Sequence, residues 1–322
     1  MKKQLALAFG LLLIGVALVG CGKSTKPSSS LGGSTPGGNS LDAAQVNDTL
    51  AAHPELVNEA LFADATPISY SDAPAGSYAA VRPFRWWRVI TSDTRTVDVV
   101  FSDPDTSGRP TSALVTVHRH LLGDFDLLVP DTTKIDSTTH LPEFRLVKKP
   151  LDDAWERQLV LHRMVDPDSV ADTASVHLGR HWRIVGTSGV VVTSLDATTQ
   201  INSLRIQAGA LDTTITDPLA LRLRPRLMCL PSIAGATLTV TTGRNDDVVV
   251  LYRDGGLRRR FTNNGDNTYT ITFPMYDFFG LRHFGVNALS NGTLFDDTAP
   301  YDSKAWLLPF AVHVRDCDVI RE

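Results

Sequence analysis

Two sets of arginine residues in the C-terminal third of the chain have a spacing that could bind anions. One set alternates along an expected strand and the other runs consecutively in a second strand: Arg222, Arg224 and Arg226, then Arg258, Arg259 and Arg260. Guanidinium groups bind carboxylates and phosphates through paired hydrogen bonds. If both strands share a sheet, the two sets predict a patch for an anionic polymer. An exposed sheet face whose arginines pair with acids is the simpler interpretation, because residues 213–322 contain 12 basic and 12 acidic residues.

The turn-like stretch that follows residue 102 is a weak candidate for a metal site. Asp103, Asp105 and Ser107 resemble the first half of a calcium loop, in which alternating oxygen ligands surround the cation. The twelfth position of such a loop carries a bidentate Glu, whereas this chain has Leu114 there. A hairpin turn uses the same residue types, and we favour that interpretation.

Histidine and acidic residues supply the other candidates for chemistry. His118 and His120 lie two apart on an expected strand, so both side chains point to one face and could bind a transition metal with a third ligand from elsewhere. Asp152, Asp153 and Glu156 could act as paired carboxylates in acid–base chemistry. The simpler interpretation of the histidines is that each is a surface residue or a hydrogen-bonded core residue, and the simpler interpretation of the acidic residues is a solvated, charge-mixed surface. The chain has no GxSxG, HExxH or Walker motif, so we expect no catalytic site, no metal and no cofactor.

The first 21 residues carry the most specific motif in the chain. Two lysines precede an apolar run over residues 5–19, which is too short to span a bilayer and has the layout of a secretory signal peptide. The run ends in Leu-Val-Gly-Cys, which resembles the bacterial lipobox. That resemblance implies cleavage before Cys21 and lipidation of Cys21, and Gly22 in place of Asp implies sorting to the outer membrane. We therefore expect a protein anchored by lipid in the cell envelope, on the periplasmic face or the outer surface; an ordinary signal peptide with a chance cysteine is the alternative.

The residues after the lipobox predict a flexible tether and one possible disulfide. Residues 22–40 are rich in Gly and Ser and hold too few apolar side chains to fold. With Cys21 lipidated, Cys229 and Cys317 remain, an even pair in an oxidising compartment. They could form a disulfide, and two buried free thiols are the alternative.

The rest of the chain predicts a β-rich protein of two domains. For residues 41–212 we expect an α+β domain with short helices on a curved antiparallel sheet. One helical stretch covers 41–63, with Ser40 as its cap and with Val46 and Leu50 one turn apart, and another begins at Pro83. The expected strands include one around Val115 and those over 125–129, 144–148 and 158–164. Its element order resembles the NTF2-like cone. Residues 213–322 contain seven short strand patterns between turn sequences, among them 236–242 and 268–273, and no helix is expected after residue 217. This pattern is typical of an immunoglobulin-like β-sandwich. Gly265 to Tyr269 resembles the turn and tyrosine corner found in bacterial domains of that architecture.

Composition and motifs together reduce the classes of function to a few hypotheses. The chain has 322 residues and a formal net charge of −4, which disfavours a nucleic-acid-binding protein. The leading hypothesis is a non-catalytic lipoprotein that binds or scaffolds another envelope component, either a protein or a polysaccharide. One alternative is a hydrolase with its site in the concave face of the 41–212 domain, and another is a lipoprotein that binds a small molecule.

Overall fold

The structure, a computed structural model, describes residues 40–54, 68–69, 81, 83–106, 108–135, 137, 142–165, 180–223, 228–231, 235–253, 257–274 and 280–313. It is rich in β-strands, which form mainly antiparallel sheets, as the sequence predicted. The helices and strands are, in chain order, α1 (Ser40–Ala52), β1 (Ile68–Ser69), β2 (Arg85–Pro104), β3 (Pro110–Ile135), β4 (Pro142–Val165), β5 (Arg180–Ser194), β6 (Ile201–Ala208), β7 (Leu211–Ile215), β8 (Arg222–Leu223), β9 (Met228–Pro231), β10 (Ala236–Thr242), β11 (Val248–Arg253), β12 (Leu257–Arg260), β13 (Thr262–Asn263), β14 (Thr268–Phe273), β15 (Gly280–Leu289), α3 (Asn291–Phe295) and β16 (Ser303–His313).

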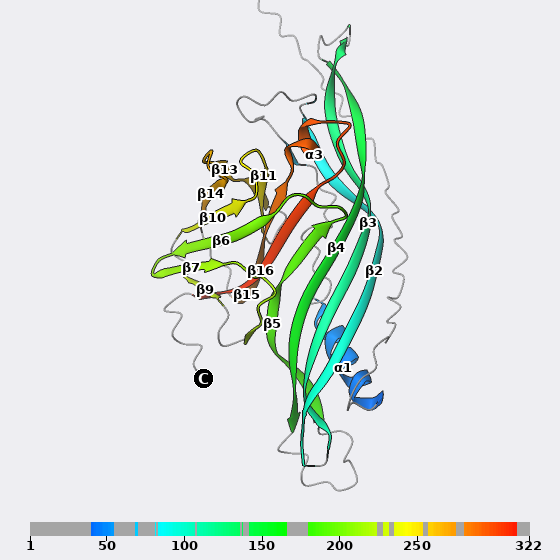
Figure 1. Cartoon of the computed structure of the whole chain (residues 1–322), viewed down its shortest axis with the longest axis vertical. Helices are drawn as coiled ribbons and strands as arrows, with labels where there is room; N and C mark the ends of the chain where they lie inside the picture. The colour runs from blue at the N-terminus through cyan, green and yellow to red at the C-terminus, as the bar shows by residue number, and fades with distance from the viewer. Residues whose placement is uncertain are drawn as a thin grey trace, which may run out of the picture.

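The described strands form two sheets. An 11-stranded sheet has the order β1-β2-β3-β4-β5-β16-β15-β11-β12, with β8 beside β5 and β9 beside β16. A five-stranded sheet has the order β13-β14-β10-β6-β7 and lies beside β15 and β16 (Figure 1). Strands from both predicted domains therefore share the larger sheet, through the antiparallel pairing of β5 with β16. The predicted boundary between residues 212 and 213 falls inside β7.

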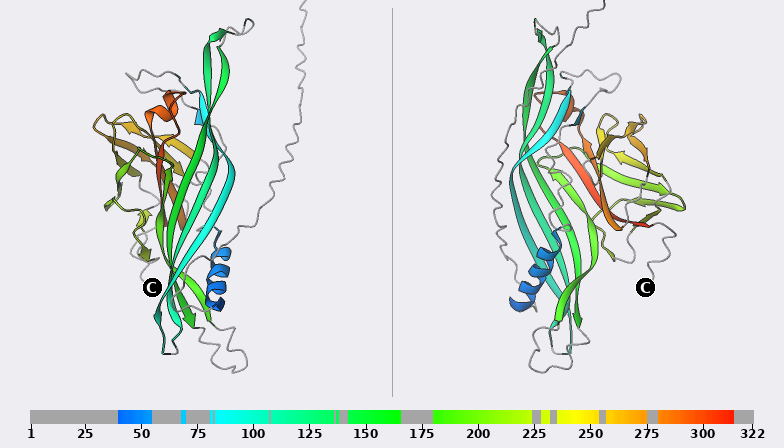
Figure 2. Two further views of the ribbon diagram at one scale, coloured as in Figure 1. Left: turned by 45° about the vertical axis from the view of Figure 1, so that its right-hand side comes forward. Right: turned by 180° about the vertical axis from the view of Figure 1, so that it is seen from behind.

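Three long strands set the shape of the molecule. β2, β3 and β4 have 20, 26 and 24 residues and run as one twisted ribbon along its length. The β3–β4 hairpin extends beyond the rest of the fold, whereas α1 lies near the opposite end (Figures 1 and 2). Close approach of β2 and β3 requires Gly123, because a Cβ atom there would lie 1.9 Å from a carbonyl oxygen of β2.

The sequence predicted several short strands where the structure has two long ones. The predicted strands over 125–129 and around Val115 are both parts of β3, and those over 144–148 and 158–164 are both parts of β4. The inward-facing positions between them hold charged residues, among them Lys149 and Asp153, both of which are buried. These residues interrupt the apolar alternation, so the sequence pattern predicted two short strands in place of each long one.

The helix predicted from Pro83 is wrong. Residues from Arg85 onward form β2, in which Trp86 and Arg88 are buried and pair with β3. The apolar spacing that suggested a helix also fits a strand, because a segment this short satisfies both periods. Pairing with the long neighbouring strand decides between them.

The N-terminal helix is confirmed over its described part. Val46 and Leu50 are buried one turn apart in α1, as predicted. Asp42 is also buried, and it accepts a hydrogen bond of 2.6 Å from the guanidinium of Arg163 on β4. This ion pair holds α1 against the long sheet. Residues 55–63 of the predicted helical stretch lie outside the described residues. In the part of the chain that the structure describes, no helix is long and apolar enough to cross a membrane.

Two hydrophobic cores meet at β11, β15 and β16. Val248 and Val250 of β11 pack into the core of the long strands, and Val249 and Leu251 pack into the core beneath the five-stranded sheet. Burial on both faces explains why this strand is a continuous apolar run rather than an alternating one. The predicted strands over 236–242 and 268–273 match β10 and β14 at both ends. The expectation of no helix after residue 217 is wrong, because Ser290 caps the short helix α3.

Candidate functional site

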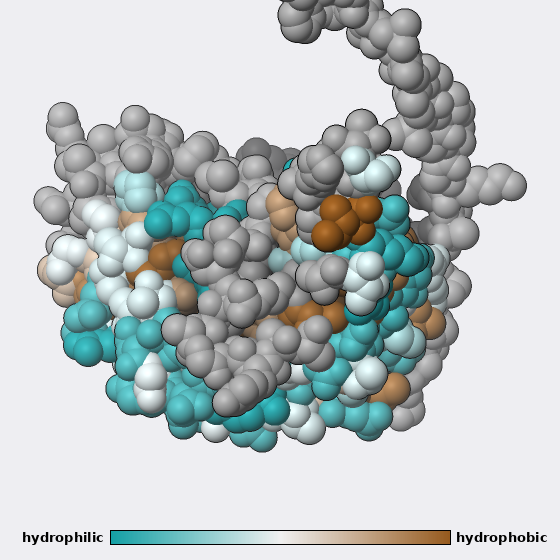
Figure 3. All heavy atoms as spheres, turned by 90° about the horizontal axis from the view of Figure 1, so that it is seen from above, coloured by the Kyte–Doolittle hydropathy of each residue, from teal (hydrophilic) through white to brown (hydrophobic). Residues whose placement is uncertain are grey.

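A groove opens where β5 ends at Ser194 while β3 and β4 continue. It has a volume of about 790 Å³, within the range of ligand-binding pockets. Its walls come from β3 and β4 near Leu122 and Asp152, the loop after β5, the β10–β11 turn, and the segment from Ser290 to Asp302. Seen from above, the described surface is mainly hydrophilic with small hydrophobic patches (Figure 3).

Asp302 organises one wall of the groove. Its carboxylate accepts hydrogen bonds from the backbone N–H groups of Thr198 and Thr199, at 3.1 and 3.0 Å, and from the hydroxyl of Thr198 at 2.6 Å. Burial by itself would raise the pKa of Asp302, but these hydrogen bonds stabilise the carboxylate and leave the pKa below its usual value. Asp302 is therefore ionised at neutral pH and holds the loop after β5 in place.

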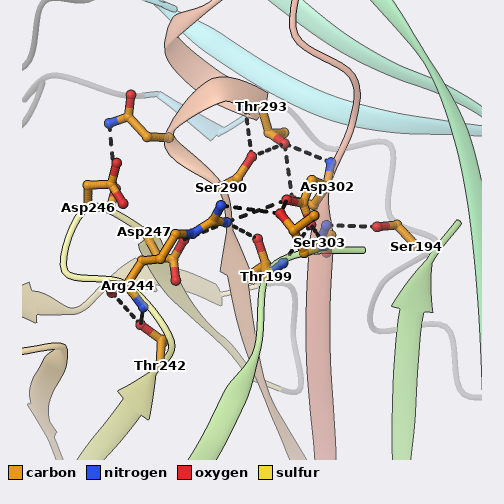
Figure 4. A network of polar contacts seen from close by, with 12 residues as sticks. Ser194, Thr199, Thr242, Arg244, Asp246, Asp247, Ser290, Thr293, Asp302 and Ser303 are labelled. Atoms are coloured by element: carbon orange, nitrogen blue, oxygen red, sulfur yellow. Dashed lines mark hydrogen bonds and ion pairs between the residues drawn. The ribbon is translucent and has the colours of Figure 1, made fainter. Parts of the chain in front are cut away.

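Arg244 bridges this wall to the β10–β11 turn (Figure 4). Its guanidinium donates to the hydroxyl of Thr199 at 2.6 Å, to Asp247 at 3.1 Å and to Asp302 at 3.4 Å. Its backbone carbonyl accepts a hydrogen bond of 3.0 Å from the buried hydroxyl of Tyr269. Burial raises the pKa of Asp247 to about 6, with the charge of Arg244 acting in the opposite direction. Hydrogen bonds therefore fix both the backbone and the guanidinium of Arg244 in one conformation.

The cap of α3 fastens the third wall. The hydroxyl of Ser290 accepts from the backbone N–H of Thr293 at 3.0 Å, and the hydroxyl of Thr293 accepts from the N–H of Asp302 at 2.8 Å. Lys149 of β4 donates to the carbonyls of Gly292 and Asp296, at 2.8 and 2.6 Å. A cation is favourable here because carbonyl groups at the C-terminal end of a helix carry partial negative charge, and the Gly292 carbonyl also accepts the backbone N–H of Asp296. These bonds tie the long hairpin to the loop that lines the groove.

A buried charged cluster lies beneath the groove. Tyr301, which lines the groove, accepts hydrogen bonds of 2.9 and 3.2 Å from Arg88 and donates one of 3.2 Å to Asp153. A further bond of 3.4 Å joins Arg88 to the hydroxyl of Tyr252. Burial raises the pKa of Asp153 to about 6 against the opposing charge of Arg88. The second carboxylate oxygen of Asp153 has no hydrogen-bond partner among the described residues, in accord with this shift.

The predicted acidic cluster was interpreted wrongly at one position. Asp152 and Glu156 lie on the outward face of β4, and both are half-buried. Asp153 points inward and is buried. Alternation along β4 separates the neighbouring carboxylates onto opposite faces. Asp153 therefore belongs to the core and not to a charge-mixed surface.

The predicted metal candidates take part in local contacts. Asp103 accepts hydrogen bonds from the hydroxyls of Ser102 and Ser112, and Asp105 accepts one from the N–H of Arg109, all within the β2–β3 turn. Ser107 lies outside the described residues. Pro104 pairs with Pro110, so the segment is a hairpin connection, the interpretation that the sequence favoured.

The two predicted histidines lie on the outward face of β3, opposite the buried Val115 and Val117. His118 contacts Asp98 at 3.5 Å, and His120 contacts Asp152 at 2.6 Å. Within the described ranges, no group of three or more His, Cys, Asp or Glu side chains is arranged to hold a metal ion.

The predicted arginine sets do not lie on adjacent strands. Arg222 is in β8 beside β5, and Arg258, Arg259 and Arg260 are in β12 at the far end of the sheet, beyond β16, β15 and β11. Arg258 stacks on the rings of Trp86 and Tyr252, at 5.9 and 5.5 Å. Arg224 and Arg226 lie outside the described residues.

The predicted cysteine sites are largely outside the described chain. Cys229 lies in β9, and both Cys317 and Cys21 lie outside the described residues. The lipidation site and the disulfide therefore stay predictions.

Apart from Asp152, sequence reasoning missed the residues that build the groove. Arg244 and Asp302 are 58 positions apart, and Arg88 and Tyr301 are 213 apart. The one available signal was the turn sequence around Arg244, which indicated a loop but no partner. Comparison with protein-family models, with curated proteins and with solved structures found no match.

Proposed function

We propose that this chain is a lipid-anchored protein of the bacterial cell envelope that binds another envelope component without transforming it chemically. The lipobox-like sequence ending at Cys21 supports the anchor, and the Gly/Ser-rich tether supports a folded part that stands off the membrane. Gly22, which follows the cysteine, supports sorting of the protein to the outer membrane. In this proposal residues 213–322 act as an immunoglobulin-like module whose loops face the partner.

The observation that carries the proposal is the rigid groove. Arg244 and Asp302 are held by each other and by Asp247, Thr198 and Thr199, so their geometry exists before any ligand arrives. Binding to a preorganised surface costs less ordering entropy than binding to mobile side chains. An arrangement of this kind favours stable recognition.

Site-specific photocrosslinking in intact cells tests the proposal. Leu195 lines the groove and is 63% exposed, whereas Leu221 is 42% exposed and lies outside the groove lining, so it is a matched control. Each leucine is replaced in the full chain by a benzophenone amino acid, and the cells are irradiated. We expect a reproducible adduct at position 195 and little at position 221. Equal adducts at both positions, or none at position 195, contradict the proposal.

A further inference from the structure

Arg244 lies between two carboxylates that differ in their surroundings (Figure 4). Asp302, on one side, accepts hydrogen bonds from two backbone N–H groups and one hydroxyl of the loop after β5, so its negative charge is well stabilised. Asp247, on the other side, has a side chain without exposed surface, and its Oδ2 atom has no hydrogen-bond partner among the described residues. One guanidinium therefore joins a carboxylate with many donors to a carboxylate with few.

The charged and titratable groups that face Asp247 come from three parts of the chain. They are Arg244 and Asp246 of its own turn, Tyr269 of β14, and Asp302 on the far side of the guanidinium. Arg244 is the cation in this set, and its side chain is 39% exposed and shared between Asp247 and Asp302. A cation that is partly in water and shared offsets only part of the cost of burying a carboxylate.

The proton affinity of Asp247 agrees with this imbalance. Burial raises its pKa to about 6, although the charge of Arg244 acts in the opposite direction. A hydrated aspartate has a pKa of about 3.9, so the closed turn binds a proton more tightly than an opened turn in which Asp247 meets water. The stability that Asp247 gives the closed turn is therefore complete below about pH 4 and is lost as the pH rises through 6. Asp302 stays ionised throughout, because its pKa lies below the usual value.

The turn that carries both residues is placed to open locally. Residues 243–247 belong to neither β10 nor β11, and three of the five are exposed. Side chains supply most of the described contacts that hold their backbone, such as the hydroxyl of Tyr269 on the carbonyl of Arg244 and the amide of Asn291 on that of Asp246. Exposed segments with few backbone hydrogen bonds open at the lowest cost. Because Arg244 and Asp246 line the groove, opening of the turn displaces one of its walls.

We propose that Asp247 is a pH-sensitive switch of the groove: its protonation holds the β10–β11 turn closed against Asp302, and its ionisation lets the turn open. The inference rests on the proposed function for the role of the groove and adds the regulation of that groove by protons. Acid closes the turn even though it removes one partner of an ion pair, because burying the charge costs more than the pair with Arg244 offsets.

Hydrogen exchange of the turn at several pH values tests the switch. The full chain is purified in detergent, and exchange of a peptide that covers residues 241–248 is measured by mass spectrometry from pH 5 to pH 8, with correction for the intrinsic rate at each pH. From pKa values of about 6 in the closed turn and about 3.9 in the opened turn, we expect opening to be about ten-fold rarer at pH 5 than at pH 7.5. A response below two-fold, or more frequent opening at pH 5, overturns the inference.

Two variants identify the group that titrates. Asp247→Asn has nearly the shape of the protonated aspartate and cannot ionise, so opening of its turn should change less than about two-fold over the same range. Asp266→Asn is the matched control, because Asp266 lies in a neighbouring turn, is exposed and is outside the groove lining, and we expect the ten-fold response to remain. A response that persists in Asp247→Asn, or that vanishes in Asp266→Asn, overturns the inference whatever the absolute rates. The response of the unaltered chain decides the matter even where Asp247→Asn does not fold.

Failure of the switch and failure of the proposed function are distinguishable, because the exchange experiment needs no partner. A turn without a pH response overturns the switch while the proposed function stands. An absence of adduct at position 195 above the position 221 control contradicts the proposed function, whereas the exchange result for the turn is unaffected.

Discussion

Replacing Tyr301 by Phe should destabilise the protein strongly and in a pH-dependent way. The hydroxyl of Tyr301 joins two buried ions: it accepts bonds of 2.9 and 3.2 Å from Arg88 and donates one of 3.2 Å to Asp153. Without it, the nearest approach of the two ions is 4.0 Å, and both stay buried. Phe fills nearly the same volume as Tyr, so the change removes hydrogen bonds without creating a cavity.

The size of the effect follows from the charges of the two partners. Hydrogen bonds to charged groups contribute about 1.5–3 kcal/mol each, and the variant loses those of the hydroxyl to two charged partners, so we expect a loss of about 4 kcal/mol at pH 8. Burial raises the folded-state pKa of Asp153 to about 6, above its unfolded value. The folded state therefore binds the proton more tightly, and the stability that this group contributes is complete below about pH 4 and lost as the pH rises through 6. At pH 5 Asp153 is protonated, and the loss in the variant should be about 1–2 kcal/mol smaller.

The assay is urea denaturation of a soluble chain that begins at Gly22, at pH 5 and pH 8, followed by tryptophan fluorescence. The matched control is Tyr269→Phe, which removes one bond of 3.0 Å to the uncharged carbonyl of Arg244. We expect the control to lose about 1 kcal/mol at both pH values. A loss below 1 kcal/mol in Tyr301→Phe, or a loss that is equal at pH 5 and pH 8, would refute the reasoning.

Three further predictions concern the anchor, the helix and the close approach of two strands. Cys21→Ser should move the protein from the membrane fraction to the soluble fraction, and continued sedimentation with membranes would contradict the lipid anchor. Asp42→Ala removes the carboxylate that pairs with the buried side chain of Arg163, so we expect a loss of about 3 kcal/mol in the free energy of unfolding and faster hydrogen exchange in α1. Unchanged exchange in α1 would show that the ion pair does not hold the helix on the sheet. Gly123→Ala places a Cβ atom 1.9 Å from a carbonyl oxygen of β2, so we expect it to lower the free energy of unfolding by at least about 2 kcal/mol. The control Gly235→Ala, whose Cβ atom meets nothing closer than 3.6 Å, should lower it by less than about 1 kcal/mol. Thermal unfolding that ranks the two variants in the opposite order would count against the register of β2 and β3.

Much of the secondary structure was predictable because it depends on short-range patterns. The alternation in residues 236–242 and 268–273 predicted β10 and β14 to the residue, since turn sequences mark both ends. The spacing of Val46 and Leu50 predicted the buried face of α1 for the same kind of reason. The strand around Phe84 to Ile90 was not predictable, because a short segment fits both periods and only its pairing with β3 selects one.

The sequence by itself determined that the chain is β-rich, where most strands of the C-terminal part lie, and which residues resemble a lipobox. Only the tertiary structure decided that the pattern-breaking residues Lys149 and Asp153 are inward-facing positions of one continuous strand. It also decided that Arg244 and Asp302 form a groove, while the predicted arginine sets lie on strands that are not neighbours. The physical reason is that apolar periodicity is a local property, recorded in adjacent residues. A buried charge needs a partner to repay its desolvation, and that partner can lie anywhere along the chain.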